Sequence, residues 1–147
     1  MDQGFETVVG LEVHVQLKTQ SKAFCGDING VNPAPNNHIS PISLAYPGTL
    51  PVINENQVHL AIKLGLALNC HISKINAFDR KSYFYPDLPK GYQITQDKYP
   101  ICIGGEFTFE SKGKEKTIRI HHIHMEEDAG TLKHSDDKSA SYVDYNR

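Results

Sequence analysis

Alternation of apolar and polar residues is clearest near the N-terminus. Every second position of residues 9–17 is apolar, namely Val9, Leu11, Val13, Val15 and Leu17. A period of two predicts a half-buried β-strand, because successive side chains then point to opposite faces. The polar face of this strand would carry Glu12, His14 and Gln16 in one row, with neighbours about 6–7 Å apart.

A helical period follows residue 54. Small and apolar residues recur there at helical spacing: Val58, Ala61, Ile62, Gly65 and Leu68. Asn54, with Gln57 three positions later, resembles a capping box. We therefore expect a helix over about 55–69 that packs on a sheet.

A β-hairpin is predicted in the last third of the chain. Phe107 and Phe109 alternate with polar residues, residues 112–114 supply a Lys-Gly-Lys turn, and alternation resumes over residues 117–120. The apolar phase then shifts at residues 121–122. This shift predicts a β-bulge just before the acidic residues 126–128.

Three other stretches lack a clean period. Residues 26–51 contain five prolines with several Gly and Asn, which excludes regular helix and predicts a long ordered loop. Residues 78–96 are rich in aromatics, Lys and Pro and predict strand and loop. Residues 142–147 resemble a strand in progress, so we expect a truncated chain, and we expect no domain boundary within it.

Composition restricts the class of protein. The chain has 147 residues, of which 39% are hydrophobic and 22% charged, with a net charge of −2. These values favour one globular domain over disorder or a dedicated basic nucleic-acid binder. The apolar stretch at residues 58–70 contains His59 and Lys63, so no membrane span is expected. No export signal is visible, and three widely spaced cysteines exclude a disulfide framework, so we expect a cytoplasmic protein.

A divalent cation site is one hypothesis for the polar positions. Glu12 and His14, opposed by Glu126 and Glu127 from a second strand, would offer carboxylate oxygens and an imidazole. Such ligands suit Mg²⁺ or Mn²⁺, whereas thiolates would select zinc. The alternative is a solvated strand face with no metal, and residue spacing alone leaves that alternative open.

A second group of charges lies among aromatic residues. Contact with phosphate or nucleic acid is one interpretation for Arg80, Lys81 and Lys90. We prefer the alternative in which the aromatic residues 83–85 pack in the core or at its rim. The chain contains no phosphate-binding glycine motif and no Ser nucleophile motif. We expect Cys70 and Cys102 to be small buried hydrophobes.

Five blocks of sequence resemble one protein family. They are VGLEVHVQL at 9–17, PGTLP at 47–51, FDRK at 78–81, YFYPDLPKGYQ at 83–93 and HMEEDAG at 124–130. In this order they resemble the B subunit of the tRNA-dependent aspartyl/glutamyl-tRNA amidotransferase. The resemblance implies an α+β fold, mainly antiparallel sheet with packed helices, similar to glutamine synthetase and guanido kinases. Residues 1–147 would be the N-terminal part of the catalytic cradle domain, without the helical and tRNA-binding tail domains.

The resemblance also implies an ATP-dependent ligase. Such an enzyme phosphorylates the side-chain carboxylate of Glu or Asp misacylated on tRNA, and ammonia then displaces the phosphate to give Gln-tRNA or Asn-tRNA. Its cofactors would be ATP and Mg²⁺. Its partners would be a glutaminase A subunit, a small C subunit and the misacylated tRNA, with no membrane. The alternative is a non-catalytic structural, tRNA-binding or subunit-binding module, and we expect the fragment alone to be inactive.

Site residues follow from the same resemblance. Glu12, His14, Glu126 and Glu127 match the family's metal and phosphoryl-transfer residues, with Glu127 and His14 expected as direct ligands. Lys81 and Tyr83 match the wall of the active site. Lys90 matches the neighbourhood where the ammonia channel enters.

Two departures from the family qualify these expectations. Many members bind structural zinc through four thiolates, whose positions are here Cys25, Asp27, Ser40 and Ser43. We therefore expect no structural zinc, and a loop that is held by packing and turn chemistry. His122 stands where the family usually has Arg, and an imidazole cannot replace a bidentate guanidinium.

Overall fold

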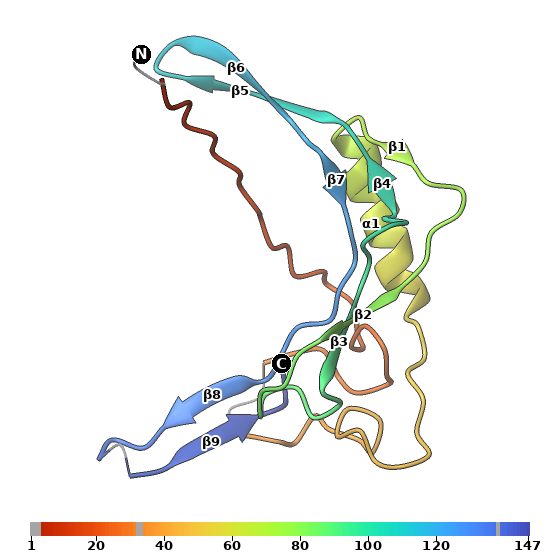
Figure 1. The fold of residues 1–147 in the computed structure, drawn as a ribbon. Coiled ribbons are helices and arrows are strands. Elements are labelled where there is room, and N and C mark those ends of the chain that lie inside the picture. Colours follow the sequence, from red (N-terminus) through yellow and green to blue (C-terminus); the bar gives the residue numbers. More distant parts are fainter. Residues whose placement is uncertain (1–3, 32–33, 138) are drawn as a thin grey trace.

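A computed structural model describes residues 4–31, 34–137 and 139–147 (Figure 1). These residues form α1 (Glu55–Ala67), β1 (His71–Ile72), β2 (Asp79–Ser82), β3 (Tyr92–Thr95), β4 (Cys102–Ile103), β5 (Glu106–Ser111), β6 (Lys114–Arg119), β7 (His122–Ile123), β8 (Thr131–His134) and β9 (Ser141–Asp144). The strands form a sheet β1–β4–β7 and the pairs β2–β3, β5–β6 and β8–β9, all antiparallel. The chain is therefore α+β, with antiparallel pairing throughout the described strands.

Helix α1 begins where the sequence predicts. The side chain of Asn54 accepts a hydrogen bond of 2.9 Å from the backbone N–H of Asn56, which satisfies one of the free donors at the helix N-terminus. The reciprocal half of a capping box is missing, because the buried Oε1 of Gln57 has no hydrogen-bond partner in the described part of the chain. The helix ends at Ala67, and Asn69 then adopts a left-handed conformation with φ of 55°.

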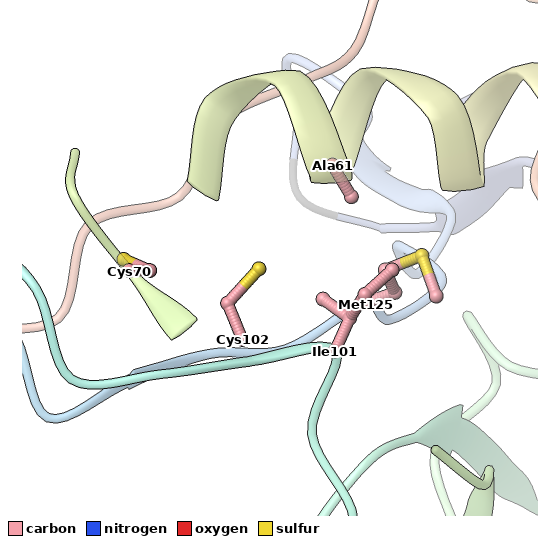
Figure 2. Close-up of a cluster of buried hydrophobic side chains, with 5 residues drawn as sticks. All are labelled: Ala61, Cys70, Ile101, Cys102 and Met125. Atoms are coloured by element: carbon pink, nitrogen blue, oxygen red, sulfur yellow. The ribbon is translucent and has the colours of Figure 1, made fainter. Parts of the chain in front are cut away.

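The core lies between α1 and the sheet β1–β4–β7. It is built from five buried side chains, shown in Figure 2: Ala61, Cys70, Ile101, Cys102 and Met125. Helix and sheet approach closely at Gly65, where an added Cβ would overlap Cys102 Sγ and lie 2.9 Å from Ile72 Cδ1. The two cysteines are therefore small core residues, as predicted.

The predicted hairpin is confirmed, but the predicted bulge is wrong. Strands β5 and β6 join through Lys112 and Gly113, both with positive φ, which matches the right-handed twist of the strands. A bulge would change the pairing register, yet the same register continues from β5–β6 into β4–β7. Gly104 and Gly105 have φ of 67° and 109° there. Their left-handed conformations redirect the ribbon without an inserted residue.

The predicted strand over residues 9–17 is also not observed. This segment is extended in Figure 1 but has no paired strand among the described residues. Its apolar side chains are exposed, including those of Leu11 and Val13. The alternating pattern fixes which side chains would share a face, but a strand also needs a neighbouring backbone for its hydrogen bonds.

The proline-rich loop is ordered against the C-terminal segment. Residues 26–51 contain neither helix nor strand where they are described, apart from a single bridge at Ile28. Lys22 Nζ donates to the carbonyl oxygens of His38 and Tyr145 at 2.6 and 2.7 Å, and so joins the loop to the C-terminal segment. No helix in the described part of the chain has the length and apolar character needed to cross a membrane.

Candidate active site

The acidic pair Glu126–Glu127 follows β7 in extended backbone. Glu127 N–H donates to the carbonyl of Ile94 at 3.1 Å, which aligns this segment with β3. Consecutive residues of an extended chain point to opposite sides. The two carboxylates therefore enter different surroundings, one on each side of the segment.

Glu127 lies in a closed, fully hydrogen-bonded environment. Lys90 Nζ donates to its Oε2 at 2.7 Å, and the N–H of Ile94 donates to its Oε1 at 2.7 Å. The side chains of Lys90 and Glu127 are only 11% and 13% exposed. A short charge-assisted contact of this kind is among the stronger hydrogen bonds in proteins. Both oxygens of Glu127 are thus already occupied by protein donors.

Glu126 lies on the more open side. Its Oε1 is 3.5 Å from His14 Nδ1 and its Oε2 is 3.4 Å from His124 Nε2. Thr95 Oγ1 donates to Oε2 at 3.3 Å. The side chain of Glu126 is 25% exposed and that of His14 is 79% exposed. The N-terminal segment thus brings its imidazole to Glu126 although it forms no strand.

A cavity of about 500 Å³ adjoins this open side. Thr95 and His124, which contact Glu126, line the cavity together with Arg80 and Lys81 from β2. Asp79 and Asp97 supply opposite charge at its wall. The cavity therefore combines cations suited to phosphate or carboxylate oxygens with carboxylates suited to a divalent cation.

Three imidazoles form a row that leads to Glu126. His121 Nδ1 lies 2.8 Å from His122 Nδ1, and His122 Nε2 lies 3.2 Å from His124 Nδ1. Burial, followed by the neighbouring His124 and His121, lowers the pKa of His122, while Asp97 and Glu12 act in the opposite direction. Sequence reasoning singled out only His122 from this row, although the close spacing of the three histidines was visible.

The aromatic segment between β2 and β3 differs from its prediction. Phe84 is 85% exposed and Tyr85 is also exposed, so the preference for packing at these two positions is wrong. Tyr83 Oη donates to Asp87 Oδ2 at 3.3 Å, and partial burial together with Asp87 raises the pKa of Tyr83. Tyr92 is covered by the guanidinium of Arg80, 4.8 Å from the ring centroid.

Four polar positions in the proline-rich loop come together. Although burial opposes the effect, the hydroxyl groups of Ser43 and Ser40 and the thiol of Cys25 hold the pKa of Asp27 below its ordinary value. Lys22 Nζ contributes from 4.0 Å. These are the four positions that the family resemblance assigns to a zinc site.

The described residues contain no group of three His, Cys, Asp or Glu side chains arranged to hold a metal ion. The closest approach to the predicted ligand set is the pair of Glu126 and His14, with Glu127 on the other side of the segment. The assignment of metal ligands stays a prediction. The structure does bring Lys81 to the cavity and Lys90 to Glu127.

Comparison with known proteins defines the family. Residues 7–147 match the family model of the GatB/GatE catalytic domain, so the chain belongs to this family. It is 54% identical over 143 residues to the B subunit of the aspartyl/glutamyl-tRNA(Asn/Gln) amidotransferase of Clostridium beijerinckii. Proteins of the same description from Oceanobacillus iheyensis and Agathobacter rectalis are 53% and 50% identical. The matches cover 97–99% of this chain, which spans 30% of the length of each relative.

Proposed function

We propose that this chain contributes the phosphoryl-transfer site of an ATP-dependent ligase that amidates misacylated tRNA. The observation that carries the proposal is the contact of Glu126 with His14 and with His124, which lines a cavity together with Lys81. The relatives are named as B subunits of aspartyl/glutamyl-tRNA(Asn/Gln) amidotransferases. The substrate would be Glu-tRNA(Gln), Asp-tRNA(Asn) or both.

Glu126 is the carboxylate that fits Mg²⁺ best, with the imidazole of His14 at 3.5 Å as an additional ligand. Mg²⁺ is commonly held by one or two carboxylates, with phosphate oxygens and water completing its octahedron, so two protein ligands suffice when a nucleotide is present. Glu12, two residues before His14 in the same segment, is a further candidate ligand in this proposal. When bound, Mg²⁺ would offset negative charge on the phosphate oxygens during transfer.

Lys81 would orient the anionic groups in the cavity, because the guanidinium of Arg80 is already placed over the ring of Tyr92. A phosphorylated carboxylate carries negative charge that an ammonium or guanidinium group stabilises. Tyr83, hydrogen-bonded to Asp87, would support the neighbouring wall. These roles require only that the side chains hold position and exclude competing water.

Lys90 and Glu127 would have a different role on the closed side. Because Lys90 and the N–H of Ile94 occupy both oxygens of Glu127, this carboxylate would reach a metal only after the Lys90 contact is exchanged. Through the N–H of Ile94 the pair holds β3 in position, and in this proposal it lies near the entry of ammonia. In this proposal ammonia is supplied by a glutaminase A subunit, and a C subunit holds the assembly together.

The finer fold assignment belongs to the same proposal. An antiparallel α+β chain is compatible with the N-terminal part of a catalytic cradle domain similar to glutamine synthetase and guanido kinases. A cytoplasmic location and the absence of structural zinc stay predictions. The alternative, a non-catalytic binding module, is favoured by the lack of a three-ligand metal group among the described residues.

The test uses the assembled amidotransferase that contains this chain. ATP-dependent conversion of Glu-tRNA(Gln) is measured with ammonium as donor, which bypasses the glutaminase. We expect Glu126→Gln to lower the rate by about a hundredfold, as when one electrostatic contact to a transition state is removed. Glu110→Gln, at an exposed position of β5, is the matched control and should retain full activity.

Two results would contradict the proposal. One is unchanged amidation by a folded Glu126→Gln assembly that still binds tRNA. The other is wild-type assembly that binds tRNA but forms no amide, which would favour the non-catalytic alternative. Parallel measurement of tRNA affinity separates these results from a loss of substrate binding.

A further inference from the structure

The β5–β6 hairpin has two chemically different faces. Its register places Phe107 opposite Ile118, Phe109 opposite Lys116 and Ser111 opposite Lys114. Paired residues of an antiparallel ribbon share a face, so these side chains form one surface. We call it the aromatic–lysine face and define it by Phe107, Phe109, Lys114, Lys116 and Ile118. The other face carries Glu106, Thr108, Glu110, Glu115, Thr117 and Arg119.

The charges of the aromatic–lysine face are unpaired. Among the described residues, no hydrogen bond or ion pair involves the ammonium groups of Lys114 or Lys116. The reason is geometric, because Glu110 and Glu115 lie opposite each other on the other side of the ribbon. Two acidic residues in direct cross-strand contact repel each other and gain nothing from the lysines. The aromatic side of the ribbon therefore presents two lysines without an acidic residue opposite them, whereas Arg119, the cation of the other face, lies opposite Glu106.

The apolar part of the same face is exposed and ordered. Phe107 is 50% and Ile118 is 46% exposed to solvent. The rings of Phe107 and Phe109 are nearly parallel, with centroids 5.8 Å apart and an interplanar angle of 14°. An isolated two-stranded ribbon is marginally stable in water, so exposed aromatic area on it favours a partner that covers it.

The hairpin is anchored at its base, away from this face. Glu106 N–H donates to the carbonyl of Leu68 at 2.9 Å, immediately after α1, and Ile120 N–H donates to Gly105 at the same distance. Thr108 and Thr117 are joined by a 2.9 Å hydrogen bond across the acidic face. Figure 1 shows the hairpin projecting from the body that α1 and β4 form. The aromatic–lysine face is thus held in place and accessible from outside.

We propose that the aromatic–lysine face binds an RNA segment, with phosphates at Lys114 and Lys116 and an unpaired base against Phe107. Lysines two residues apart on a strand lie about 6–7 Å apart, so both can contact one RNA backbone. Exposed rings beside unpaired lysines are the combination that binds single-stranded nucleic acid. The two lysines favour an anionic partner, and the half-exposed ring of Phe107 offers a surface on which an unpaired base can stack. This inference rests on the proposed function, in which the substrate is a tRNA.

The test measures the affinity of the amidotransferase assembly for transcribed tRNA by fluorescence anisotropy over a series of salt concentrations. Lys114→Glu/Lys116→Glu should bind about tenfold more weakly or worse, and the slope of log affinity against log salt should fall by about 1–2. Phe107→Ala should weaken binding about fivefold or more with an unchanged salt slope, since it removes stacking and no charge.

The matched control reverses the charge of two exposed lysines outside the hairpin. Lys63 lies on α1 and Lys98 follows β3, so Lys63→Glu/Lys98→Glu makes the same change in net charge away from the hairpin. Its affinity should stay within about twofold of wild type. If both double variants lose the same tRNA affinity, the effect comes from net charge alone and the proposal is overturned. Unchanged tRNA affinity of the hairpin variants would also overturn it.

Activity measurements distinguish failure of this inference from failure of the proposed function. With ammonium and saturating tRNA, the hairpin variants should keep kcat and show a raised KM. If they keep tRNA affinity but lose subunits on gel filtration, a protein partner covers the face and the RNA inference is wrong. Absence of amidation by the wild-type assembly would contradict the proposed function whatever the hairpin variants do to RNA affinity.

Discussion

Glu126 and Glu127 are neighbours in the chain but lie in contrasting environments. Glu127 is largely covered and paired with Lys90 at 2.7 Å, whereas Glu126 is more exposed and meets His14 and His124 at 3.5 and 3.4 Å. The closed side has little room for a further ligand, and the open side adjoins the cavity of about 500 Å³. The contrast shows that two consecutive residues of an extended chain can differ in role: one carboxylate is held by an ion pair, and the other is accessible to a ligand.

The largest expected effect comes from removing the cation on the closed side. Lys90→Met leaves the largely covered carboxylate of Glu127 without its partner, and we expect the free energy of unfolding to fall by about 3–5 kcal/mol. Urea denaturation measures this change. Lys98→Met, at an exposed position, is the control and should stay within about 0.5 kcal/mol of wild type. Equal stability of Lys90→Met and wild type would remove the distinction between the two sides.

Removing the charge of the acid itself should cost less. Glu127→Gln keeps one oxygen that can accept from Ile94 but loses the charge that faces Lys90, and we expect a loss of about 1.5–3 kcal/mol. The double variant Lys90→Met/Glu127→Leu should recover most of the stability lost in Lys90→Met, because no unpaired charge remains there. If the double variant is no more stable than Lys90→Met, the unpaired charge of Glu127 is not the cause of the loss of stability in Lys90→Met.

A third carboxylate extends the comparison to acid pH. Lys133 and the N–H groups of Asn146 and Asn36 lower the pKa of Asp144 to about 2, from an ordinary value of 3.8. A carboxyl with a lowered folded pKa stabilises the fold above its unfolded pKa, and this contribution is lost as the pH falls from about 4 to 2. Between about pH 4 and pH 2 the melting temperature of Asp144→Asn should therefore fall less than that of wild type. Equal falls in melting temperature for the two proteins would contradict the prediction.

The smallest effect on stability is expected on the open side. Glu126→Gln removes a charge next to His14 and His124, whose side chains are 79% and 34% exposed. Because exposed ion pairs contribute little to stability, the free energy of unfolding should change by no more than about 0.5 kcal/mol. The same variant is the one expected to lose amidation. A loss of stability as large as that of Glu127→Gln would mean that Glu126 is also structural.

Local patterns predicted the elements whose partners are close in sequence. The helix after Asn54 and the hairpin through Lys112 and Gly113 are both present, because capping and a two-residue turn are specified within a few residues. The strand over residues 9–17 is the opposite case. Its alternation is the most regular in the chain, yet the backbone partner that would make it a strand is not among the described residues.

The sequence predicted which residues belong to the candidate site, but only part of how they are arranged. Family resemblance and ligand chemistry both pointed to His14, Glu126 and Glu127, and the structure joins the first two. The pairing of Glu127 with Lys90, 37 positions away, could not be deduced from spacing, since it depends on how the segment lies against β3. The phase shift at residues 121–122 was visible, but the pairing register runs through it unchanged, opposite two glycines with positive φ.

The sequence by itself determined the family, the α+β class, the helix and hairpin, and the kinds of side chain available for chemistry. Only the tertiary structure decided that Glu126 contacts two residues of the cavity wall, Thr95 and His124, while Glu127 pairs with Lys90. It also placed the lysines of the hairpin on its aromatic side without acidic partners. The physical reason is that periodicity assigns side chains to faces within one element. What each face meets is decided by packing between segments that are distant in the chain.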